Sequence, residues 1–136
     1  MSAHLVWIDL EMTGLNPEHD RIIEMATIIT DGDLNVIAEG PVLAIRQEQA
    51  LLDGMDEWNQ THHSGSGLLD RIAREGVAEI EAEAQTLAFI EDHVAPNTAP
   101  LCLVLTSPLH CSSALRSVRM SGPAVRSVLT GRDGSI

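Results

Sequence analysis

Residues 5–11, LVWIDLE, place two acidic side chains at the end of a short hydrophobic run. Such a run is typical of a buried β-strand. Residues two apart in a strand point to the same face and lie roughly 6.6 Å apart along the chain. We therefore expect Asp9 and Glu11 to extend from one face of a strand near the start of the chain.

The next segments predict two more strands in an antiparallel meander. Residues 21–30 (RIIEMATIIT) are rich in isoleucine and predict the second strand. Asp31-Gly32 is a typical hairpin signal, and residues 34–45 predict the third strand, with Gly40-Pro41 as the place where it would break.

The chain then changes from strands to helices. Residues 53–60 predict a short helix, and Ser66 is the expected N-cap of a helix over residues 67–75. A longer helix is predicted from apolar residues at helical spacing, namely Ile80, Ala84, Leu87, Ile90 and Val94. Residues 101–105 predict a fourth strand, which a crossover helix would place parallel to the first. The predicted fold class is α/β.

Charge is distributed unevenly along the 136 residues, whose net charge is −12 at pH 7. Residues 1–102 contain 19 of the 20 acidic residues, four of the eight arginines and no lysine, whereas residues 103–136 are net positive. Non-specific binding of nucleic acid depends on Lys and Arg that neutralise phosphates. We therefore expect any nucleic-acid substrate to be short and held largely through bound cations.

The sequence predicts a cytoplasmic protein that has no membrane partner. Its N-terminus lacks the charged and apolar regions of a signal peptide, and its longest apolar runs are too short to span a bilayer. In a reducing compartment we expect Cys102 and Cys111 to be free thiols.

Paired carboxylates on one strand face are oxygen ligands of the kind that Mg²⁺ and Mn²⁺ prefer. Two such ions about 3.5–4 Å apart can stabilise the attacking and leaving oxygens of a phosphodiester displacement. From the spacing alone, a solvent-exposed acidic face of an edge strand is the favoured interpretation, because Asp-x-Glu is a short and common pattern.

Longer stretches of the sequence favour the metal interpretation, because they resemble one family. Residues 6–15 (VWIDLEMTGL) resemble the first exonuclease motif of the DnaQ-like exonucleases. Three further stretches resemble oligoribonuclease specifically: residues 20–30 (DRIIEMATIIT), 38–45 (AEGPVLAI) and 55–68 (MDEWNQTHHSGSGL). The resemblance covers about residues 4–102.

This resemblance implies a ribonuclease-H-like fold and an enzyme that hydrolyses short oligoribonucleotides, including dinucleotides, from the 3′ end. Mg²⁺ or Mn²⁺ would be the cofactor, and Asp9 and Glu11 match the family's metal-binding catalytic acids. The resemblance also implies a homodimer, although part of the family's dimer contact falls in the region that this chain does not match.

Three residues match substrate-binding positions of the family. Leu15 matches the residue that wedges against a substrate base, and Trp58 matches an aromatic residue that helps close the base pocket. His63 is expected in the loop after the helix that carries Trp58, where it would approach the substrate. Without the resemblance, Leu15 is typical of a loop hydrophobe and Trp58 of a helix-packing residue. His62 is expected to be a solvent-exposed loop histidine.

The resemblance ends near Cys102. The family has a third acid shortly after this point, and a catalytic histidine and fourth acid farther along, but residues 103–113 (LVLTSPLHCSS) contain no acid and the single later acid is Asp133. We therefore predict an N-terminal part of an exonuclease domain over residues 1–105, which would be truncated, and an irregular tail outside the family pattern over residues 106–136. A shifted reading frame is one origin for such a tail, and divergence of a genuine chain is the other.

The sequence thus predicts the family function with impaired activity in this chain. The alternative is a non-catalytic truncated or frameshifted remnant, or a binding module, that keeps part of the metal site. A DNA proofreading exonuclease is disfavoured because residues 55–68 resemble oligoribonuclease.

Overall fold

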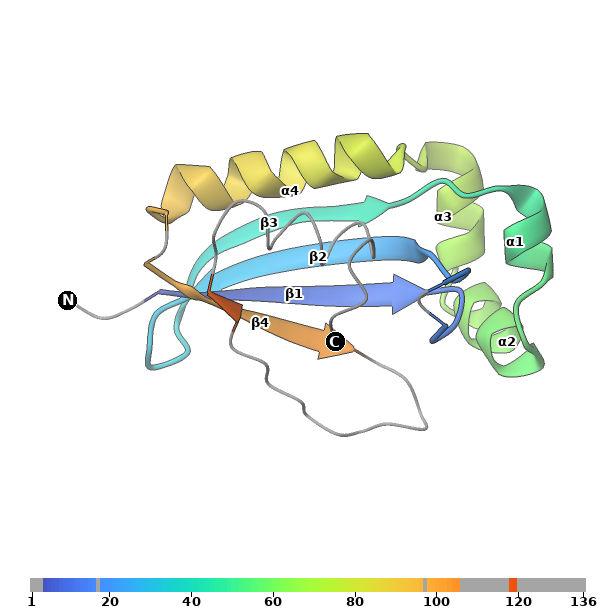
Figure 1. The fold of residues 1–136 in the computed structure, drawn as a ribbon, viewed down its shortest axis with the longest axis horizontal. Coiled ribbons are helices and arrows are strands. Elements are labelled where there is room, and N and C mark those ends of the chain that lie inside the picture. The colour runs from blue at the N-terminus through green and yellow to red at the C-terminus, as the bar shows by residue number, and fades with distance from the viewer. Residues whose placement is uncertain (1–3, 17, 97, 106–117, 120–136) are drawn as a thin grey trace.

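The computed structural model describes residues 4–16, 18–96, 98–105 and 118–119 (Figure 1). Its five strands form one sheet in the order β3-β2-β1-β4-β5. The strands are β1 (Leu5–Met12), β2 (Ile22–Thr30), β3 (Val36–Ala44), β4 (Pro100–Leu105) and β5 (Val118–Arg119). Strand β1 pairs antiparallel with β2, β2 pairs antiparallel with β3, and β4 is parallel to β1. The predicted α/β fold, with its meander and additional parallel strand, is confirmed.

Four helices accompany the sheet: α1 (Gln49–Asp53), α2 (Glu57–Gly65), α3 (Leu68–Glu75) and α4 (Glu79–His93). Figure 1 shows α1, α2 and α3 grouped beyond the C-terminal end of β1, whereas α4 runs along the sheet. Among the described residues, every helix is too short or too polar to cross a membrane.

The main core lies between α4 and one face of the sheet. Val6, Ile8 and Leu10 of β1 are buried there with Ile90 of α4, and each such side chain typically contributes about 1.5–3 kcal/mol through burial. Because strand residues alternate between faces, the odd-numbered Asp9 and Glu11 project from the face opposite to α4.

A second, smaller core fixes the three short helices at the end of the sheet. Ile23 of β2 and Ala44 of β3 pack in it against four helix or turn residues, Leu52, Met55, Leu68 and Ile72. This packing holds α2 and α3 close to the end of β1, where the acidic residues lie.

The predicted helix over residues 53–60 is wrong, because two helices meet there. Helix α1 ends at Asp53, with Gly54 as its C-cap. The side chain of Asp56 then caps α2, since its Oδ1 accepts a hydrogen bond from the backbone N–H of Asn59 at 2.8 Å. Side-chain oxygens at this position satisfy a free N–H of the first helical turn.

The prediction that Ser66 caps the next helix is also wrong. Ser66 is the C-cap residue of α2, and its hydroxyl donates to the carbonyl of His63 at 3.1 Å. Gly67 takes the N-cap position of α3 with a φ of 80°. Glycine adopts this left-handed conformation without a steric cost.

Strand β3 continues through Gly40-Pro41, where the sequence predicted a break. The pairing with β2 shifts at this point, since Val42 pairs with Ala26 and Glu39 with Ile28. A Cβ atom on Gly40 would lie 2.7 Å from the ring of Phe89. The glycine therefore allows α4 to pack closely on the strand.

The buried face of α4 is only partly the predicted one. Ile90 and Val94 are buried, but Ile80 is 78% exposed and Ala84 is also exposed. The helix instead turns Ala82 and Thr86 toward the sheet. Successive residues of a helix are rotated by about 100°, so a face centred on position 82 directs positions 80 and 84 outward.

Most of the predicted tail over residues 106–136 lies outside the described residues, and so does Cys111. Within it, Val118–Arg119 form β5, which pairs antiparallel with β4. Cys102 is a buried free cysteine, and burial raises the pKa of its thiol.

Candidate active site

Three carboxylates share the face of the sheet opposite to α4. On β1, Asp9 is exposed and Glu11 is half-buried. Asp9 pairs with Ala26 of β2, and Glu11 pairs with Glu24. Directly opposite residues of an antiparallel pair share a face, so Glu24 joins the two predicted acids.

The environment of this acidic group disfavours the charged form of Asp9. Desolvation by the surrounding protein raises the pKa of Asp9, and the negative charges of Glu11 and Glu24 raise it further. A hydrogen bond from the backbone of Leu10 offsets part of this effect. Clustered carboxylates of this kind favour a bound cation, which would relieve their repulsion.

Glu24 has an arginine partner from α3. Arg71 forms an ion pair with the Glu24 carboxylate and a longer one with Glu75 Oε1 at 3.4 Å. The hydrogen bond to Glu24 raises the pKa of Arg71. Neither Glu24 nor Arg71 was predicted as a site residue from the sequence. The hairpin register would have revealed Glu24, because it determines which β2 residue lies opposite Glu11.

The two neighbouring histidines lie in α2 rather than in the predicted loop. His63 is only 1% exposed. Its Nε2 lies 2.9 Å from the backbone carbonyl oxygen of Met12, whereas its buried Nδ1 has no hydrogen-bond partner among the described residues. Helix α2 is thereby joined to the end of the strand that carries Asp9 and Glu11.

The adjacent His62 is exposed, as expected, but it is not isolated. Its ring stacks on that of Trp58 with a centroid distance of 4.6 Å and an interplanar angle of 14°. Trp58 itself is 40% exposed. One turn of helix α2 therefore presents an aromatic surface near the end of β1.

Glu11, His62 and His63 form a cluster that the sequence analysis did not predict. Each offers one metal-ligand atom, and these atoms all lie within 4.8 Å of one another. The signal available in the sequence was the His-His pair, but its distance from a strand acid depends on how α2 docks.

Leu15 lies in the turn after β1 and is 56% exposed. Asp20 holds this turn, because its carboxylate accepts hydrogen bonds from Thr13 Oγ1 at 2.9 Å and from the backbone N–H of Asn16 at 2.8 Å. A Cβ atom on Gly14 would lie 2.4 Å from that carboxylate. A side chain at position 14 would therefore displace the Asp20 carboxylate that holds the turn, and the turn displays Leu15 to solvent.

An exonuclease family model matches residues 6–107, three quarters of the chain, and this match includes every residue of the candidate site. This chain belongs to the exonuclease family. Among curated relatives, the oligoribonucleases of Alcanivorax borkumensis and Pseudomonas aeruginosa are 62% and 59% identical to it over 99 residues. That match covers 73% of this chain and 55% of each relative. This chain therefore spans about half the length of the curated relatives it matches.

Solved structures support the fold of this exonuclease-family chain. A product-bound exonuclease I aligns with a TM-score of 0.54 and 21% identity, covering 79% of this chain and 22% of that one. Escherichia coli exonuclease I in complex with a dT13 oligonucleotide aligns with a TM-score of 0.53 and 22% identity, covering 76% and 20%. Exonuclease I has the same ribonuclease-H-like arrangement, so the predicted fold is confirmed.

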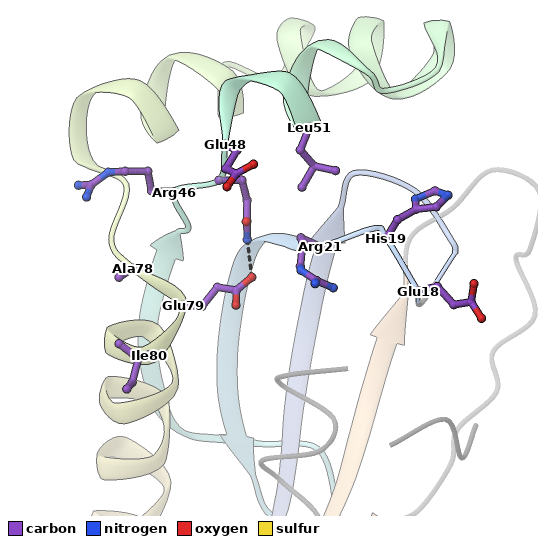
Figure 2. Close-up of a pocket in the computed structure, with 10 residues that line it drawn as sticks. Glu18, His19, Arg21, Arg46, Glu48, Leu51, Ala78, Glu79 and Ile80 are labelled. Carbon is purple, nitrogen blue, oxygen red and sulfur yellow. Dashed lines mark hydrogen bonds between the residues drawn. The ribbon is translucent and has the colours of Figure 1, made fainter. Parts of the chain in front are cut away.

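A cavity lies beside the start of α4 (Figure 2). The described residues around it include Arg21 and Arg46 but none of the predicted site residues. Arg46 donates to the carbonyl of Gly76, and Gln47 donates to Glu79 Oε1 at 2.6 Å. Glu18 and Glu48 line the cavity as well. Its acids outnumber its arginines, so this cavity is a poor site for an anionic substrate.

Proposed function

We propose that this chain carries the N-terminal part of a 3′-to-5′ exoribonuclease that hydrolyses short oligoribonucleotides, including dinucleotides. The main support is that Asp9 and Glu11 share one exposed sheet face within the region that is 54–62% identical to oligoribonucleases.

Asp9 and Glu11 would hold the divalent cation, either Mg²⁺ or Mn²⁺. Their carboxylates fit such an ion, because they are hard oxygen ligands and because charge repulsion and desolvation already raise the pKa of Asp9. The cation, when bound, stabilises negative charge on the attacking and leaving oxygens of the phosphodiester. The acidic body of the chain would otherwise repel the substrate phosphates.

Trp58, Leu15 and His63 would bind the substrate. Trp58 is 40% exposed, and stacking of its ring on a base is typically worth about 1–3 kcal/mol. Leu15 would wedge against a second base from the turn after β1. A contact between His63 and the substrate requires the surrounding side chains to move, because the histidine ring is buried.

We further propose that the chain as printed has low activity. The family's third acid is expected shortly after Cys102, but residues 103–113 contain no acid. Loss of a metal ligand should lower metal affinity or activity at least about 10–100-fold, since loss of even a supporting residue typically has this effect. The second candidate function is a non-catalytic remnant or binding module that keeps part of the metal site, and the lack of an acid in residues 103–113 favours it.

Hydrolysis of a 5′-labelled ribodinucleotide in the presence of Mn²⁺ tests this proposal, with Asp9→Asn as the comparison. Turnover by the chain that is lost in Asp9→Asn supports a nuclease, even at a rate far below that of full-length relatives. Mn²⁺ binding without turnover supports the remnant. Failure to bind Mn²⁺ contradicts both functions.

A cytoplasmic location and a homodimer remain predictions from the sequence and from the family resemblance. Light scattering of the purified chain tests the second, since a dimer has twice the mass of the 14.7 kDa monomer.

A further inference from the structure

A set of nitrogen and oxygen ligands lies beside the acidic row. The ligand atoms of Glu11, His62 and His63 lie within 4.8 Å of one another. Glu11 comes from β1, whereas the two histidines come from the last turn of α2. The cluster therefore joins the strand to the helix that packs at its end.

In the part of the chain that the structure describes, one buried nitrogen of His63 has no hydrogen-bond partner and is free to bind a ligand. The carbonyl oxygen of Met12 can only accept a hydrogen bond, so the His63 nitrogen 2.9 Å away, Nε2, must donate. In the neutral ring, the hydrogen-bonded Nε2 carries the proton and Nδ1 keeps a free lone pair. That Nδ1 is buried and has no hydrogen-bond partner among the described residues. Histidines that ligate metals commonly have one nitrogen fixed in this way by a backbone carbonyl.

His62 is held beside the His63 ring by its stacking on Trp58. Its ring is stacked on Trp58 at 4.6 Å and meets the edge of the His63 ring at 5.4 Å. Stacking restricts the rotation of an exposed side chain, so less conformational entropy remains to be lost when His62 binds an ion.

We propose that Glu11, His62 and His63 form a binding site for a borderline transition-metal ion, with Zn²⁺ as the best fit. Two imidazoles and one carboxylate are a common three-residue zinc set, and the fourth tetrahedral position is left for water. Ligands bonded to one zinc ion at 2.0–2.1 Å are about 3.3 Å apart. The exposed His62 and the half-buried Glu11 would therefore move toward His63 by roughly 1–1.5 Å.

This site differs in chemistry from the proposed Mg²⁺ or Mn²⁺ site. Imidazole nitrogen favours zinc over the hard ions, whereas Asp9 and Glu11 offer oxygen alone. Glu11 belongs to both sets, so Zn²⁺ and Mn²⁺ would compete for it. The inference does not rest on the proposed nuclease activity, because zinc binding is measurable without any turnover.

Titration of the full chain with Zn²⁺, and with Co²⁺ as a spectroscopic probe, tests the site. We expect Zn²⁺ binding and visible Co²⁺ absorption bands of a nitrogen-ligated ion in the unsubstituted chain. His62→Ala should weaken Zn²⁺ binding by at least about 10–100-fold, since the loss of even a supporting residue has this effect at metal sites. His93→Ala removes a histidine from the last turn of another helix, α4, and should leave zinc affinity unchanged.

A crossed comparison separates this site from the proposed catalytic one. Asp9→Asn should lose Mn²⁺ affinity and keep Zn²⁺ affinity, whereas His62→Ala should do the reverse. An unchanged zinc affinity in His62→Ala overturns the site. A loss of zinc affinity in His93→Ala as large as that in His62→Ala also overturns it. Parallel loss of both ions in both variants would mean one common site and would also overturn the proposal.

Discussion

Glu11 and Glu24 lie directly opposite each other on β1 and β2, and Arg71 of α3 forms an ion pair with Glu24. Like charges in this position destabilise an antiparallel pair unless something compensates them. The arginine compensates Glu24, whereas desolvation and the charges of Glu11 and Glu24 raise the pKa of Asp9. This arrangement suits a cation that binds at Asp9 and Glu11 rather than at Glu24.

Arg71→Ala should destabilise the protein by about 1–2 kcal/mol, because it leaves a partly buried carboxylate facing Glu11 without its charged hydrogen-bond partner. Chemical denaturation measures this loss. Arg74 is an exposed arginine on the same helix. Arg74→Ala is therefore the control, and it should change the free energy of unfolding little. The Arg71→Ala loss should shrink when Glu24→Gln is also present, and an equal loss in both backgrounds would exclude the ion pair as its cause.

Asp9→Asn should stabilise the protein at neutral pH in the absence of divalent cations. The pKa of Asp9 is raised in the folded state, so the ionised carboxylate lowers the free energy of unfolding. This loss of stability is absent below the pKa of Asp9 in the unfolded chain, about 3.9, and it is complete above the raised pKa of Asp9 in the folded protein. The stability difference between the variants should therefore diminish as the pH falls through the folded pKa. A wild-type chain more stable than Asp9→Asn at neutral pH without metal would contradict this assignment.

Trp58→Ala should weaken dinucleotide binding about 5–150-fold, which corresponds to one lost base stack. The second tryptophan, Trp7, donates a hydrogen bond to Thr30 Oγ1 at 3.0 Å. Trp7→Phe should therefore leave binding intact and make Trp58 the single tryptophan of the chain. Its fluorescence should change as the dinucleotide binds, and a constant signal at saturation would argue against stacking.

Gly40→Ala should destabilise the fold by about 1–3 kcal/mol, the usual range for a group forced into a packed core. The added methyl would meet the Phe89 ring at 2.7 Å and the carbonyl oxygen of Thr27 at 2.9 Å. Gly65→Ala is the matched control, because a Cβ atom there has no neighbour within 4 Å. Equal thermal shifts for the two variants would show that α4 does not pack closely at Gly40.

The strand pattern was predictable because alternation and hairpin signals are local. They placed the three meander strands, and they put Asp9 and Glu11 on one face. The helix boundaries were less predictable, since the division between α1 and α2 depends on how Gly54 and Asp56 cap the adjoining helices. Similarly, Ile80 has the spacing of a core residue, but the short side chains of α4 pack against the sheet instead.

The candidate site was predictable only in part, for the same reason. Asp9 and Glu11 belong to one strand, so their spacing reveals their relation. Glu24, Arg71 and His62 join the site through strand register and helix docking, which relate residues far apart in the chain. The burial of His63 likewise follows from the way α2 packs against the end of β1.

Calorimetric titration with Mn²⁺ tests most directly whether Asp9 and Glu11 hold a divalent cation. We expect binding by the unsubstituted chain that falls at least about 10–100-fold in Asp9→Asn and in Glu11→Gln. Asp92→Asn, which removes an exposed acid from α4, should bind like the unsubstituted chain. Equal Mn²⁺ affinity in all four proteins would contradict the account.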